Sequence, residues 1–195
     1  LRILVRTEGA REIDPDLPVV DAVGSAVDQW RRSIAQFTEI NPEYFYLGSL
    51  ILTVYVQGEN DTSLRGSSDI DIKFTDSLPT LIGETKLLVT NANSIGHAEI
   101  TVGLQDLSLR GLHNVLTHEL GHALGLKHSA IEEDLMYSER EKSEVKEGIL
   151  CPSTLDLYAL ASIYQWIETG SYSPYNASSV TLPEATEYTV VACNP

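Results

Sequence analysis

Apolar residues recur at two spacings along the chain, and the spacing distinguishes strands from helices. Short apolar or alternating runs rich in β-forming residues predict strands at residues 1–6, 49–58, 69–74, 85–90 and 95–104. The stretch DIDIKF at 69–74 alternates strictly between polar and apolar residues, as expected of a half-buried strand. All the predicted strands therefore lie in the first half of the chain or close to it.

A spacing of three and four residues predicts an early helix over 16–37. Asp16 is the expected cap of this helix, and Pro18 lies near its first turn. Its apolar residues form a single stripe that we expect to be buried. The stripe consists of Val19, Val23, Ala26, Val27, Trp30, Ile34 and Phe37.

Two further helices are predicted in the second half of the chain. One begins near Leu109 or Gly111, and the other lies within 151–170, where Ser153 and Asp156 form a capping signal. Strands interrupted by one helix and followed by helices are typical of an α+β domain with a cleft between its halves. A length of 195 residues is enough for one such domain with a sizeable core.

The helix that begins near residue 110 contains the segment HELGHALGLKHS at 118–129. At about 100° per residue, His118 and His122 lie about 40° apart on one helix face, so both rings can reach one small ion. Gly125 can end the helix in the left-handed conformation, which lets His128 approach the same ion. The spacing therefore predicts a zinc site.

Three histidines leave one tetrahedral position of zinc open, which is typical of a catalytic rather than a structural site. Zinc lowers the pKa of a bound water from about 15.7 toward about 7. Glu119 follows His118 directly and is the candidate general base that takes the proton of this water and passes it to the leaving amine. The pattern thus predicts metal-assisted hydrolysis.

The remaining histidines are interpreted differently. His113 lies about 140° around the helix from His118, away from the metal face, and is expected to be structural. His97 lies on a predicted strand and is not expected to bind the metal. The alternative for the whole motif is an ordinary buried helix face, which does not account for the five fixed positions of H-E-x-x-H-x-x-G-x-x-H.

Composition narrows the range of partners. The formal net charge is −15 and the pI is about 4.6, so the surface repels phosphate backbones and nucleic-acid binding is not expected. An acidic excess that only keeps the protein in solution is the simpler interpretation. No apolar run approaches the ~20 residues of a membrane helix. The sequence begins without an initiator Met, which we interpret as a processed form.

The chain has two cysteines, Cys151 and Cys193. Both could be buried free thiols, but their even number and the position of Cys193 in the tail favour a disulfide. A structural disulfide implies an oxidising compartment. N-x-[ST] sequons at Asn60 and Asn176 agree with an exported protein.

The segment HELGHALGLKHS, followed by DLMY, resembles the active-site region of the metzincin metallopeptidases. Ser129 directly after the third histidine makes the matrixin group the most similar. The resemblance implies that Met136, the only methionine in the chain, is the Met-turn residue and lies as an apolar floor under the zinc ligands. It covers residues 1–170 and is most specific over 118–137.

The matrixin resemblance implies a single α+β domain with a mixed twisted sheet, an early helix, an active-site helix, a Met-turn and a C-terminal helix. Residues 1–125 would form the upper subdomain, 126–170 the lower subdomain and 171–195 a tail. In the C-terminal helix, Asp156 matches an acidic residue buried near the Met-turn. A horizontal cleft would separate the two subdomains.

The resemblance also implies where an extended peptide substrate would lie. GHAEITV is similar to the antiparallel edge strand, so the peptide would pair as a strand with the edge at 95–102, contacting Gly96, His97 and Ala98. Asn114 matches a position at the floor of the pocket beside the zinc, although as a helix residue it could equally face solvent. The loop after the Met-turn would form the pocket wall.

Some family features are not matched. No latency segment of the type PRCGxPD precedes the domain in this sequence, and residues 57–96 contain no histidine for a second, structural zinc. The acidic loops could hold Ca²⁺, but the sequence identifies no ligands. Tyr137 comes one residue after Met136, whereas some metzincins place a tyrosine ligand two residues after it, so Tyr137 is not expected to bind zinc.

Three functions are compatible with these residues. The leading hypothesis is a zinc endopeptidase, secreted or at the cell surface and monomeric, that hydrolyses protein substrates. A binding or adhesion module on an inactive metzincin scaffold is the second, although Glu119 and all the ligands are retained. A zinc hydrolase of non-peptide substrates is the third.

Overall fold

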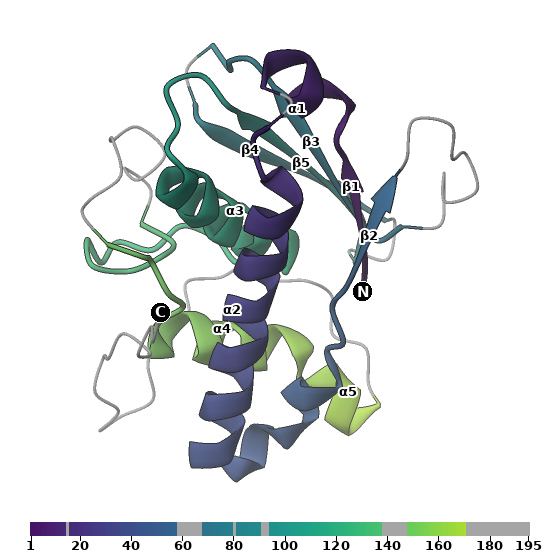
Figure 1. Ribbon diagram of the computed structural model, residues 1–195. Helices are drawn as coiled ribbons and strands as arrows, with labels where there is room; N and C mark the ends of the chain where they lie inside the picture. The colour runs from purple at the N-terminus through teal and green to yellow at the C-terminus, as the bar shows by residue number, and fades with distance from the viewer. Residues whose placement is uncertain (15, 58–67, 80, 91–93, 138–147, 171–195) are drawn as a thin grey trace.

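The computed structural model describes residues 1–14, 16–57, 68–79, 81–90, 94–137 and 148–170. These residues form a mixed α+β structure in which one sheet lies beside and above a set of helices (Figure 1). The fold class expected from the sequence is therefore confirmed. In this part of the chain no helix has the length and apolarity needed to cross a membrane.

The sheet has five strands in the order β2-β1-β3-β5-β4. The β4 strand runs antiparallel to β5, and the other neighbours are parallel, so the sheet is mixed as expected. All five strands were predicted at nearly these positions. Their bounds are β1 Arg2–Arg6, β2 Thr53–Gln57, β3 Ile70–Thr75, β4 Gly83–Val89 and β5 Ile95–Gly103.

The expected position of the edge strand is wrong. The β5 strand lies inside the sheet, and Ala98 is paired with Ile70 of β3 on one side and Leu87 of β4 on the other. The edge is β4, because β4 and β5 follow each other closely and pair antiparallel, which adds β4 outside β5. On this side of the sheet the outer strand open to a substrate is therefore β4, and residues 95–102 with Gly96, His97 and Ala98 lie behind it.

Two helices pack against the same face of the sheet, α2 (Val19–Ile40) and α3 (Leu109–Ala123) (Figure 1). The whole predicted stripe of α2 is buried, which confirms the periodicity. The predicted cap is wrong, because α2 starts after Pro18 and has no side-chain cap. Trp30 joins the two helices by donating from Nε1 to the backbone oxygen of Thr117 at 2.9 Å.

The lower part of the structure contains α4 (Thr154–Tyr164), α5 (Trp166–Thr169) and the 3₁₀ segment η1 (Pro42–Ser49). The long α2 extends beyond the sheet and crosses α4 (Figure 1). The Ser153 capping box at the start of α4 was predicted and is present. The short helix α1 (Glu8–Ile13) and η1 were not predicted.

Candidate metal centre

The α3 helix places the first two histidines of the predicted site. Ser108 caps the helix by accepting a hydrogen bond from the backbone N–H of Gly111 at 3.1 Å. The helix ends before Gly125, whose φ of 103° lies in the region that favours glycine. The backbone N–H of Leu126 then returns to the oxygen of Gly121 at 2.9 Å, which turns the chain toward His128.

The three predicted ligand side chains come together. One nitrogen from each of His118, His122 and His128 lies within 4.8 Å of the others. The Nε2 atoms of His122 and His128 are 3.1 Å apart. Zn–N bonds of about 2.0–2.1 Å in a tetrahedron require nitrogens roughly 3.3 Å apart, so the separation of His122 and His128 is close to that of two ligands of one zinc ion.

Backbone carbonyls orient two of the imidazole rings. The Nδ1 atom of His118 lies 2.8 Å from the oxygen of Leu135, and Nδ1 of His122 lies 2.9 Å from the oxygen of Leu126. We assign the ring proton to Nδ1 in both, because a carbonyl oxygen can only accept. The lone pair of each Nε2 is then directed to the cluster, as a metal requires.

Met136 lies directly against the active-site helix. It is buried, and its Sδ atom would be 2.5 Å from a Cβ atom added to Gly121. A side chain at residue 121 would therefore force Met136 to shift from this position. The turn around Met136 is closed by a hydrogen bond from the N–H of Ser129 to the oxygen of Met136 at 2.7 Å.

The Glu119 side chain is buried and faces the edge strand β4. The Oγ1 atom of Thr85 lies 2.6 Å from Glu119 Oε2. A Cβ atom added to Gly83 would be 2.5 Å from Glu119 Oε1. The sequence alone points to neither Gly83 nor Thr85, because nothing in the pattern of β4 indicates contact with a residue 34 positions away from Thr85.

Asn114 is buried rather than solvent-facing. Its amide nitrogen donates to the oxygen of Gly148 at 3.0 Å, and its Oδ1 accepts from the N–H of Leu150 at 2.9 Å. Asn114 therefore fixes the point where the segment after the Met-turn returns to the helix. Its role in a substrate pocket stays a prediction, since residues 138–147 lie outside those described.

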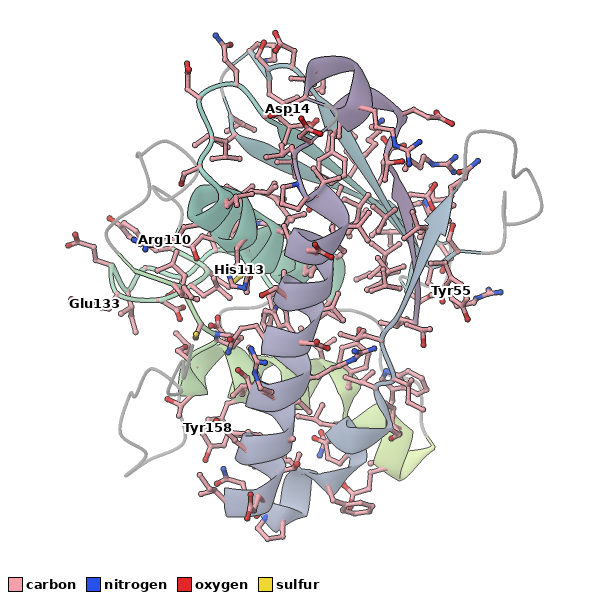
Figure 2. All side chains as sticks on the ribbon, viewed as in Figure 1. Asp14, Tyr55, Arg110, His113, Glu133 and Tyr158 are labelled. Carbon is pink, nitrogen blue, oxygen red and sulfur yellow. The ribbon has the colours of Figure 1, made fainter. Side chains whose placement is uncertain are left out.

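The other two histidines lie apart from the cluster. His113 is buried where α3 faces α2 (Figure 2), and burial lowers its pKa. This position agrees with a structural role. The Nδ1 atom of His97 lies 3.2 Å from the oxygen of Ser68. Neither residue belongs to the metal-ligand cluster found among the described residues.

Two acidic residues meet between the Met-turn and α4. Asp134 and Asp156 are both buried, as the matrixin resemblance implied for Asp156. Burial, followed by the neighbouring Asp134 carboxylate, raises the pKa of Asp156 well above its usual value. Asp156 Oδ2 also accepts from the backbone N–H of Ser153 at 2.8 Å. Asp134 was not singled out in the sequence.

Only one of the two cysteines of the predicted disulfide lies among the described residues. Cys151 is buried at the start of the segment that leads into α4. Cys193 lies outside the described residues, and so do the sequons at Asn60 and Asn176. The pairing therefore stays a prediction.

Comparison with known proteins gives one match to a family. The model of the matrixin family matches residues 56–165, more than half of the chain. The match runs from β2 to the end of α4 and includes Glu119 and the three clustered histidines. No curated protein matches the sequence.

Proposed function

The chain belongs to the matrixin family of metallopeptidases, and on that premise we propose that it is a zinc-dependent endopeptidase that cleaves extended protein segments. The observation that carries this proposal is the convergence of His118, His122 and His128, with Glu119 on the same helix. The histidine nitrogens are a borderline-soft donor set that suits zinc. A bound zinc ion would polarise the scissile carbonyl and make its water more acidic.

The protein residues then supply the proton transfers. Glu119 accepts a proton from the attacking water and donates it to the leaving amine. The backbone carbonyls of Leu135 and Leu126 keep the rings of His118 and His122 oriented during turnover. Met136 packs against Gly121 and supports the helix from below.

The proposed substrate site is the edge strand β4, in place of residues 95–102. The outer edge of β4 has no neighbouring strand in the described sheet, so an extended peptide can add to it through main-chain hydrogen bonds. Gly83 and Thr85 at the start of β4 lie against Glu119. A peptide on this edge therefore passes close to the proposed base, which supports cleavage within an extended segment.

The test compares Glu119→Ala with Glu133→Ala, a change of an exposed acidic residue (Figure 2). We expect Glu119→Ala to retain zinc and lose cleavage of casein, while Glu133→Ala behaves as the parent. Glu119→Ala protein that cuts casein at the parental rate would contradict the assigned mechanism. A parent that holds zinc and cleaves no peptide library would favour a binding module, and one that cleaves only esters would favour a non-peptide hydrolase.

The proposal also covers secretion of the protein, its disulfide and its domain organisation. A secreted protein with a Cys151–Cys193 disulfide agrees with the family and with the even number of cysteines. We also propose that residues 1–195 form one monomeric catalytic domain, with an upper subdomain at 1–125, a lower subdomain at 126–170 and a tail at 171–195. Mass spectrometry of the alkylated, unreduced protein tests the disulfide, because a paired chain takes up no alkylating reagent.

A further inference from the structure

The edge strand β4 turns one face toward the active-site helix. Thr85 is paired with Ile100 and Gly83 with Val102, and both of these β5 residues are fully buried in the core. Side chains at alternate positions of a strand share a face, so Gly83 and Thr85 both face α3. Both positions lie against the same residue of that helix, Glu119.

The hydroxyl of Thr85 is placed to donate to the carboxylate. Its Oγ1 atom lies 2.6 Å from Glu119 Oε2 and 3.1 Å from the backbone oxygen of Glu119. Both partners can only accept when the carboxylate is ionised, so the single hydroxyl proton belongs to Thr85. The shorter contact identifies the carboxylate as its acceptor, and hydrogen bonds to charged oxygens are the stronger kind.

Gly83 provides the space that the carboxylate occupies. A Cβ atom at this position would lie 2.5 Å from Glu119 Oε1 and 2.8 Å from Glu119 Cγ. Separations of this size cannot persist, so a side chain at residue 83 would displace Glu119. The absence of a side chain at 83 and the hydroxyl at 85 therefore define one position of the carboxylate.

We propose that Thr85 is a positioning residue, which holds the Glu119 carboxylate in the orientation needed for proton transfer, and that Gly83 makes the room for it. This inference rests on the proposed role of Glu119 as the general base. The same strand then has two functions: its outer edge pairs with the substrate, while its inner face fixes the base.

Positioning matters because a general base works only within hydrogen-bond reach of the proton that it removes. A carboxylate has two oxygens with about four lone-pair sites, so one hydroxyl donor leaves it able to accept a proton. A hydroxyl on a packed strand can hold the carboxylate with little loss of freedom on binding substrate. Without the Thr85 hydroxyl, Glu119 could occupy rotamers that do not reach the reacting water.

The alternative is that Thr85 only satisfies a buried carboxylate and stabilises the fold. The two roles differ in kinetics. A positioning role lowers kcat and leaves KM, zinc content and melting temperature close to the parent, whereas a purely structural role lowers the melting temperature without a selective loss of kcat.

The experiment measures kcat and KM on a quenched fluorescent peptide for zinc-loaded Thr85→Val, Thr85→Ser and Thr101→Val proteins. Valine keeps the shape of threonine without its hydroxyl, and serine keeps the hydroxyl. Thr101→Val is the matched control on β5, because residue 101 alternates with the buried Ile100 and Val102 and so points to the opposite face.

We expect Thr85→Val to lower kcat by about 10- to 100-fold, less than the roughly 10²–10⁴-fold that a general base contributes, because the base itself is retained. Thr85→Ser should recover most of the loss, and Thr101→Val should match the parent. A parental kcat in Thr85→Val, a change in KM alone, or an equal loss in Thr85→Ser would overturn the proposal.

Gly83→Ala provides a second test that leaves the Thr85 hydroxyl in place, since its Cβ atom would lie 2.5 Å from Glu119 Oε1 and 2.8 Å from Val115 Cγ1. It should also lower kcat while zinc remains bound, and a parental kcat would overturn the role assigned to Gly83. Glu119→Ala distinguishes a failure of the positioning role of Thr85 from a failure of the proposed function. If Glu119→Ala is inactive and Thr85→Val is fully active, only the positioning role fails; if Glu119→Ala is active, the proposed function itself fails.

Discussion

Two buried carboxyl groups, those of Glu119 and Asp156, differ in their partners. Glu119 and Asp156 are exposed by only 2% and 3%. Glu119 receives a hydrogen bond from the hydroxyl of Thr85 and neighbours the ligand histidines in sequence. Asp156 faces another acid, Asp134, and closes the capping box of α4.

Burial alone therefore does not identify a catalytic acid in this protein. A carboxylate that accepts a hydrogen bond and lies next to a metal site is placed to act as a base toward a metal-bound water. A carboxyl group that faces a second acid is driven to keep a proton, and its hydrogen bonds serve the fold. The comparison predicts that changes at the two positions have opposite consequences for activity and stability.

The largest expected effect is on turnover at Glu119. Glu119→Gln keeps the size of the side chain and removes its basicity, so kcat should fall by about 10²–10⁴-fold, as expected for loss of a general base. The melting temperature should change little. A steady-state peptide-cleavage assay measures kcat, and thermal unfolding of the same zinc-loaded sample measures the melting temperature. Retained turnover, or a large loss of stability, would remove the contrast between the two carboxyl groups.

Asp156→Ala should show the opposite pattern. It removes the capping box and one hydrogen-bond partner of buried Asp134, so the free energy of unfolding should fall by roughly 1–3 kcal/mol. Zinc content and kcat should stay near the parent at low temperature. Denaturant unfolding measures the loss, with the exposed change Glu168→Ala as control. A stable but inactive Asp156→Ala protein would show that this acid acts in catalysis.

The smallest effect concerns pH. The pKa of Asp156 is raised in the folded protein, so folding is favoured by its proton. This contribution is complete below the unfolded pKa of about 3.9 and is lost as pH rises toward the folded pKa. Asp156→Asn stays neutral throughout.

The melting temperature of Asp156→Asn minus that of the parent should therefore increase between pH 4 and the raised pKa, and then level off. Taking the difference removes effects common to both proteins, such as protonation of the zinc ligands. A difference that is constant or decreases with pH would argue that Asp156 is ionised in the fold and that its environment is not the one described.

The parts of this structure that sequence could predict are those in which the signal is local. The zinc ligands lie within eleven residues on one helix and the turn after it, and Gly125 marks the turn. The stripe of α2 is a property of one helix and was predicted completely. The capping box at Ser153 likewise involves residues three positions apart.

The errors concern contacts between distant segments. Alternation predicts a strand but not its neighbours, so the sequence did not show that β4 rather than β5 forms the edge. The contact of Thr85 with Glu119 depends on the same strand order. The α1 and η1 segments were missed because they are too short to display a periodic apolar stripe.

Zinc content and proteolysis, measured together on one sample, test the central claim most directly. The parent should carry one zinc ion per chain, lose casein cleavage when a chelator removes the ion, and regain it when zinc is restored. The matched His128→Ala protein should neither retain the ion nor cleave. Cleavage that persists in the zinc-free protein, or full zinc occupancy in His128→Ala, would contradict the assignment of the three histidines.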